Sequence, residues 1–218
     1  MRARAILLIV VCTAWAGGPV RAELHAIKLR DGVRLEGSTH HGGLQPSYAI
    51  RLADPALRPL FDYARQVRAS ALPRWTKVAR VKAAVRRALP GRAYDAPAYR
   101  ALLAKHRRDG TSVPIGAYVE HGVGVCRENA ILTHLALAEA GIASRMIYVE
   151  AKQGERVEDH AVVITPHRGD AYVVDAYNGN FDGARLRSLL GRSGDLRFLR
   201  IHAFPRVFSG RGRPPAPR

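Results

Sequence analysis

The chain has 218 residues and a formal charge of +17 at pH 7, with 35 lysines and arginines against 18 acidic residues. This length suits one substantial hydrophobic core. Thirty of the basic residues are arginine, spread along the chain without interleaved aromatic residues, which is typical of a solvated surface. The composition therefore argues against nucleic-acid binding as the main function and favours attraction to an anionic cell-envelope surface.

The first 22 residues have the pattern of a secretory signal peptide. A basic start precedes a mostly apolar run from Ala5 to Trp15, and a small-residue region ends at Ala22. The apolar run could also form a buried helix, but its flanks favour export. We therefore expect a mature chain of residues 23–218 with a charge of +14 in a periplasmic or secreted location. No later segment approaches the roughly 20 apolar residues of a membrane span, so we expect no transmembrane segment after cleavage.

The mature chain is predicted to begin with an extension over residues 23–53. Within it, residues 24–35 alternate in hydropathy around a three-residue loop that ends at Gly32, where glycine supplies the left-handed conformation. In this predicted hairpin Ile27 faces Leu35 and Leu29 faces Val33. Residues 37–53 show no clear pattern.

The main domain is predicted over residues 54–208, followed by a disordered basic tail at 209–218. Asp54 and Pro55 are expected to open its first helix, as cap and first residue. Helices are predicted at 54–67, at about 75–89, at 97–107 and at 184–190. Their apolar residues recur at spacings of three and four, with arginine and lysine on the opposite side of the second helix.

A different kind of segment begins at Cys126. Residues 130–138 are apolar except Thr133 and His134, which predicts a helix buried on most sides and ended by Gly141. Strands are then expected at 143–149, 160–164 and 171–175. Several helices, one of them buried on a small antiparallel sheet, define an α+β domain.

Signal cleavage would remove Cys12 and leave Cys126 as the single cysteine of the mature chain. A lone thiol in an oxidising compartment is either reactive or a liability, with an inert buried thiol as the alternative. Gly122 and Gly124 let the backbone turn tightly into the helix. The helix start can stabilise a thiolate and can offer backbone N–H groups to an oxyanion.

The base is expected from the two strands that follow. Symmetric pairing about a loop at 165–170 sets His160 opposite Asp175, close enough for the imidazole to donate to the carboxylate. A slip of two residues would keep both side chains on one face. We therefore predict Cys126 as nucleophile, His160 as base and Asp175 as the group that orients the histidine.

These residues lie in segments that resemble the transglutaminase-like, papain-related superfamily. The similar segments are Gly124-Val125-Cys126-Arg127-Glu128-Asn129-Ala130, Leu135 through Ala140-Gly141-Ile142-Ala143-Ser144-Arg145, Asp159-His160-Ala161-Val162 and Tyr172-Val173-Val174-Asp175. The resemblance implies a papain-like core and thioester chemistry on amide bonds. The chain departs from many members by having Ala161-Val162 where they have tryptophan and Arg127 where they have an aromatic residue.

The resemblance implies a thiol hydrolase or transferase that acts on a peptide bond or a glutamine γ-carboxamide of a protein or peptide substrate, and the signal-peptide pattern adds that the enzyme is secreted. Transamidation and a non-catalytic domain that binds peptides or envelope fragments are the alternatives, with a basic envelope adaptor as a further one. Tyr118 and His121 are candidates for an additional oxyanion donor.

Three other polar residues are expected to have structural roles. Glu128 and Asn129 are expected to support the helix start, and Asn178 to lie in a turn. His134 is expected to be a satisfied core histidine.

A zinc site would combine Cys126, His134, His160 and Asp175. Structural zinc sites usually show ligand pairs at short spacing, which this set lacks. We therefore expect neither a metal nor a cofactor.

Overall fold

The computed structural model describes residues 29–37, 45–190, 194–202 and 207–209. Within these residues the chain forms six α-helices and two four-stranded sheets, which confirms the predicted α+β class. The predicted signal segment at 1–22 and tail residues 210–218 lie outside the described residues. No helix in the described part of the chain has the length and apolar character needed to cross a membrane.

The helices predicted in the first half of the chain are present. A short 3-10 turn at Pro55–Leu57 leads into α1, and the Asp54 carboxylate caps it by accepting the backbone N–H of Ala56 at 3.0 Å. The helices are α1 (Arg58–Ala69), α2 (Arg74–Ala88), α3 (Pro97–Arg108), α4 (Ile115–Glu120), α5 (Cys126–Glu139) and α6 (Leu186–Leu190). The sequence pattern did not predict α4.

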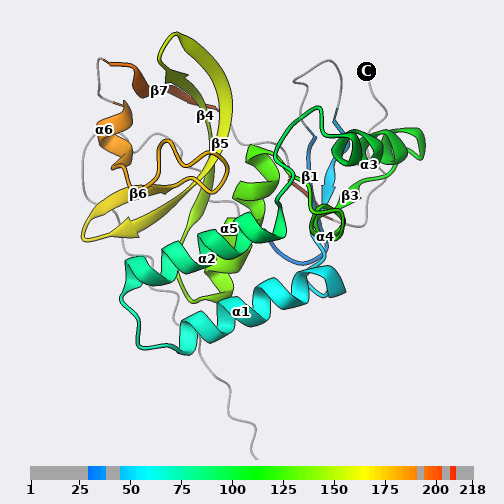
Figure 1. Cartoon of the computed structure of the whole chain (residues 1–218), viewed down its shortest axis with the longest axis horizontal. Helices are drawn as coiled ribbons and strands as arrows, with labels where there is room; N and C mark the ends of the chain where they lie inside the picture. Colours follow the sequence, from blue (N-terminus) through cyan, green and yellow to red (C-terminus); the bar gives the residue numbers. More distant parts are fainter. Residues whose placement is uncertain (1–28, 38–44, 191–193, 203–206, 210–218) are drawn as a thin grey trace, which may run out of the picture.

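Helix α5 lies at the centre of the molecule, between the larger sheet and the smaller one (Figure 1). It contacts α1, α2 and α4 as well as strands of the larger sheet. The helix ends as predicted at Gly141, which has a φ of 69°. The N–H of Ile142 donates to the carbonyl of Leu137, and that of Gly141 to Ala138, which is the Schellman arrangement.

The larger sheet has the order β6-β5-β4-β7, and all its neighbours are antiparallel. One face packs on α5 through residues such as Met146 and Val163. The other face packs with α6 in a second apolar cluster that includes Phe181 and Phe198. The strands are β4 (Arg145–Gln153), β5 (Arg156–His167), β6 (Asp170–Val174) and β7 (Leu196–His202).

The predicted register between β5 and β6 is wrong by two residues. Ile164 pairs with Val173 instead of Ala171, because the strands extend through Pro166 and His167 instead of ending in a six-residue loop. The turn consists of Arg168 and Gly169, whose φ angles of 50° and 79° suit a two-residue hairpin. The same register continued would set Asp175 opposite Val162, so His160 and Asp175 are diagonal neighbours.

The smaller sheet, of order β3-β2-β1-β8, joins segments far apart in the sequence. Its strands are β1 (Val33–Leu35), β2 (Tyr48–Ala49), β3 (Val113–Pro114) and β8 (Val207–Ser209). Gly32 is left-handed as predicted, with a φ of 76°. The predicted pairing of Leu29 with Val33 is wrong, because Leu29 is not in a strand and β1 pairs with β2 and β8. Residues 24–28 lie outside the described part of the chain.

Candidate active site

Cys126 is the first residue of α5 and is 5% exposed. Glu128 and Asn129 have the helix-start roles predicted for them. The Glu128 carboxylate accepts the N–H of Val125 at 2.8 Å, and the Asn129 amide donates to the carbonyls of Gly124 and Val125. The Glu128 carboxylate is fully buried, and it also accepts a hydrogen bond from the Tyr48 hydroxyl. These bonds hold the first turn of the helix, and therefore the thiol, in one position.

Gly124 is required by the close packing around this helix start. A Cβ at this position would lie 2.8 Å from a methyl carbon of Leu89 and 2.9 Å from the Cβ of Glu128. Gly122 has a φ of 63° and provides the turn that leads into the segment. Gly124 is thus needed because neighbouring atoms leave no room for a Cβ, and Gly122 because its backbone is left-handed.

His160 and Asp175 form a buried pair despite the shifted register. Nε2 of His160 lies 3.2 Å from Oδ2 of Asp175, and the two residues are 2% and 1% exposed. The pairing of β6 with β5 ends at Val174 and Val163, so Asp175 lies one residue beyond it. This position lets the carboxylate lean along the strand direction toward His160.

The Asp175 carboxylate is itself oriented. Its Oδ1 accepts the N–H of Tyr177 at 3.2 Å, which leaves Oδ2 for the imidazole. The backbone N–H of Asp175 donates to the Asp182 carboxylate at 3.2 Å, and Asp182 also pairs with Lys82 of α2. The segment that follows β6 is therefore tied to a helix from the first half of the domain.

The Cys126 thiol lies near enough to the His160 ring to raise its pKa. Since Nε2 faces Asp175, Nδ1 is the ring nitrogen available to the sulfur. Burial lowers the pKa of His160, but the hydrogen bond to Asp175 and the neighbouring Cys126 together outweigh it and raise the pKa to about 10. An imidazolium next to a thiol favours the thiolate. The structure thus brings Cys126, His160 and Asp175 together.

Tyr94 also contacts the thiol, and sequence reasoning missed it. Its hydroxyl lies 3.5 Å from the Cys126 sulfur, and its ring packs edge-on against Tyr99. Burial, followed by the nearby Cys126, raises the pKa of Tyr94 above its ordinary value. The residue lies in the irregular segment between α2 and α3, where no periodic pattern distinguishes it from other tyrosines.

The segment that carries Tyr94 is fixed to the segment after Asp175. The Tyr177 hydroxyl donates to the carbonyl of Arg92 at 2.6 Å, and the Arg92 guanidinium donates to the carbonyl of Tyr177 at 3.4 Å. Arg92 also donates to the carbonyl of Arg86, in α2, and to that of Leu89, the residue after α2. Tyr94 is therefore held at the thiol by bonds within two residues of it.

The two donors suggested from the sequence have different surroundings. Tyr118 is fully buried in α4, where its ring packs against those of Tyr48 and Tyr99. His121 is exposed at the end of α4. Among the tyrosine side chains of the described residues, Tyr94 is the one with a hydrogen bond to the sulfur.

Arg127, the residue after the cysteine, has a structural environment. Its guanidinium lies between the rings of Tyr48 and Tyr148, 4.9 Å and 5.2 Å from their centroids. It donates to the Tyr148 hydroxyl and to the carbonyl of Glu36, both at 2.7 Å. Burial lowers the pKa of Arg127, but the surrounding tyrosines and Glu128 raise it by more, so the guanidinium stays charged. Arg127 thereby links the smaller sheet to β4 of the larger one.

His134 behaves as the predicted core histidine. Its Nδ1 lies 2.9 Å from the hydroxyl of Ser144, and burial lowers its pKa to about 4, so the ring is neutral at pH 7. Asn178 is exposed and precedes Gly179, whose φ is 80°, in the expected turn. In the described part of the chain, no group of three or more histidine, cysteine or acidic side chains is arranged to hold a metal ion.

Comparison with known proteins gives limited similarity. No family model matches the chain, and no curated protein matches it. A crystal structure of a candidate cysteine protease from Cytophaga hutchinsonii, at 1.9 Å, is 15% identical with a TM-score of 0.44. The match covers 70% of this chain and 46% of that protein, so the chain spans less than half of its length. Similarity at this level does not establish a family for the chain.

Proposed function

We propose that the protein is a thiol enzyme that acts on amide bonds of a protein or peptide substrate, with Cys126 as nucleophile, His160 as acid and base, and Asp175 as the orienting carboxylate. The single observation that carries this proposal is the buried pair of His160 and Asp175 beside the Cys126 thiol. A nucleophile beside a base that a third group orients is the arrangement that covalent catalysis requires.

The proposed reaction begins with an ion pair of thiolate and imidazolium. The sulfur attacks the carbonyl carbon of a peptide bond or glutamine γ-carboxamide, and the C=O π pair moves to the oxygen. When the tetrahedral intermediate collapses, the C–N bond breaks and His160 protonates the departing amine or ammonia. A thioester remains on Cys126 until neutral His160 takes a proton from water, which hydrolyses it.

Hydrolysis is the favoured outcome because water needs no dedicated acceptor site. An amine that reaches the thioester before water would give transamidation instead. We also propose export as the context for the enzyme, because the N-terminal pattern favours a signal peptide and a periplasmic or secreted location. The surplus of arginine over acidic residues would hold the mature protein near an anionic envelope surface.

The similarity of the motifs to transglutaminase-like domains supports the same proposal from the sequence side. The departure at Arg127 does not remove any group from the proposed reaction, since this side chain is engaged with Tyr48, Tyr148 and Glu36. A papain-related core would place the nucleophile at the start of a buried helix and the histidine on the sheet packed against it, which matches the positions of Cys126 and His160.

The test uses the mature chain, residues 23–218, with a carbobenzoxy-Gln-Gly probe and a mixture of tryptic peptides. Mass spectrometry is expected to show glutamine converted to glutamate or peptide bonds cleaved, and hydroxamate if hydroxylamine is added. Cys126→Ser should abolish these changes, whereas His134→Gln, a histidine of the same helix that faces Ser144, should retain them. Equal binding of peptides by wild type and Cys126→Ser without turnover would instead identify a binding domain.

A further inference from the structure

Tyr94 is a partly exposed residue in contact with the buried thiol. The sulfur-bearing residue is 5% exposed, whereas Tyr94 is 36% exposed. Its hydroxyl is 3.5 Å from the sulfur. A carbonyl group that reaches the sulfur from the side of Tyr94 would come close to this hydroxyl.

Attack by a thiolate on a carbonyl creates an oxyanion two bonds away from the sulfur. Such a charge needs donors about 2.7–3.1 Å from the oxygen, and removing one costs on the order of 100-fold or more in rate. Backbone N–H groups in the first turn of α5 have no partner within the helix and can supply one donor. A second donor must reach the oxygen from outside the helix.

We propose that Tyr94 is this second donor and therefore a further catalytic residue, whose hydroxyl binds the oxyanion formed when Cys126 attacks an amide carbonyl. The inference rests on the proposed function and adds a group to it. As the C–S bond forms, the C=O π pair becomes a lone pair on oxygen, and the Tyr94 hydroxyl turns from the sulfur to that oxygen. Tyr94 keeps its proton throughout, and the hydrogen bond is released when the C=O bond reforms.

Three observations support this role beyond the contact itself. The ring is packed against Tyr99 with centroids 6.3 Å apart and planes at 90°, which fixes the direction of the hydroxyl. The mutual bonds of Arg92 and Tyr177 tie the segment that carries Tyr94 to the segment after Asp175. The raised pKa of Tyr94 keeps the hydroxyl protonated at any pH where the enzyme would work, so it can donate.

The experiment compares two reactions of the same thiol in the mature protein. Acylation by 4-nitrophenyl acetate passes through an oxyanion, whereas alkylation by iodoacetamide does not. Tyr94→Phe keeps the ring and removes the hydroxyl. We expect its acylation rate to fall at least about tenfold and toward 100-fold, with alkylation within about threefold of wild type.

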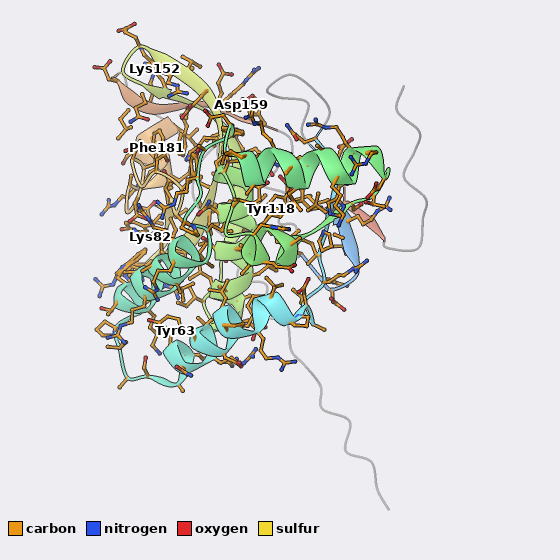
Figure 2. The ribbon with its side chains drawn as sticks, turned by 45° about the vertical axis from the view of Figure 1, so that its right-hand side comes forward. Tyr63, Lys82, Tyr118, Lys152, Asp159 and Phe181 are labelled. Atoms are coloured by element: carbon orange, nitrogen blue, oxygen red, sulfur yellow. The ribbon has the colours of Figure 1, made fainter. Side chains whose placement is uncertain are left out.

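Tyr63→Phe is the matched control, since Tyr63 lies on α1 at the other end of the molecule from Asp159, the neighbour of His160 (Figure 2). It should leave both rates unchanged. If Tyr94→Phe and wild type are acylated at equal rates, the inference about Tyr94 is overturned and the proposed function is not. If Tyr94→Phe loses acylation and alkylation in parallel, the inference is overturned in favour of a packing role for Tyr94. Absence of Cys126-dependent acylation in wild type would overturn the proposed function together with the inference.

Discussion

Replacing Asp175 by asparagine isolates the carboxylate's effect on His160. The substitution keeps the size of the side chain and an oxygen for the Tyr177 N–H, but removes the charge 3.2 Å from Nε2. The rise in the pKa of His160 from 6.5 to about 10 corresponds to roughly 5 kcal/mol between the two protonation states, shared among Asp175 and Cys126 and opposed by burial. Losing the carboxylate should therefore lower the pKa of His160.

The assay is NMR titration of the histidine ring signals in the mature protein. Wild-type His160 should stay charged up to about pH 9 and titrate near 10, and in Asp175→Asn it should titrate at a clearly lower pH. His134 is the internal control, because its low pKa comes from burial alone and should not change. Turnover of the glutamine probe should fall by roughly 100-fold or more. Titration of His160 near pH 10 in the variant, or near pH 6.5 in wild type, would refute this reasoning.

Three other predictions concern stability and the contacts around the site. The pKa of His160 is higher in the folded protein because of its pairing with Asp175, so the stabilisation from this pair is fully present below pH 6.5 and is lost as pH rises through about 10. In urea unfolding, Asp175→Asn should therefore lose more free energy of unfolding at pH 6 than at pH 10.5. An equal loss at both pH values would contradict the pairing. Gly124→Ala should lower the free energy of unfolding by about 1–3 kcal/mol, because the added Cβ would lie less than 3 Å from atoms of Leu89 and Glu128. An unchanged urea midpoint would show that the helix start can shift to make room. Tyr177→Phe removes the 2.6 Å hydrogen bond to the Arg92 carbonyl and should lower the free energy of unfolding by about 0.5–1.5 kcal/mol. It should also slow acylation of Cys126 by 4-nitrophenyl acetate more than alkylation of Cys126. No change in either reaction would mean that this bond does not position Tyr94.

The sequence predicted the elements whose signals are local. Helix α5 was located within a residue or two because glycines precede Cys126, apolar residues follow it and Gly141 ends the helix. Asp54 was recognised as a cap because its side chain acts on a backbone N–H two residues away. Such features depend on neighbours in sequence, so the residue types alone indicate them.

The missed features depend on packing between distant segments. The β5–β6 turn was misplaced because Pro166 suggested a loop and because Arg168, instead of glycine, has the first positive φ. Strands of two or three residues, such as β2 and β3, are too short to show a period of two. The position of Tyr94 at the thiol depends on Arg92 and Tyr177 meeting across 85 residues, and nothing near Tyr94 in the sequence indicates this.

His160 and Asp175 were nevertheless paired correctly from an incorrect register. A slip of two residues keeps side chains on the same face of a sheet, and diagonal neighbours remain within reach of long side chains. The contact at 3.2 Å shows that the imidazole and the carboxylate span this diagonal. Predictions of which residues share a face are therefore more robust than predictions of which residues are directly opposite.

The most direct test of the account is to trap the covalent intermediate. The mature protein is mixed with excess carbobenzoxy-Gln-Gly, quenched in acid within seconds, digested and examined by mass spectrometry for a thioester on Cys126 with the mass of the probe less ammonia. This adduct is expected in wild type, and it is expected to be lost in His160→Ala. An adduct of equal amount in His160→Ala, or none in wild type while the probe is turned over, would contradict the claim that His160 activates Cys126 for attack on amides.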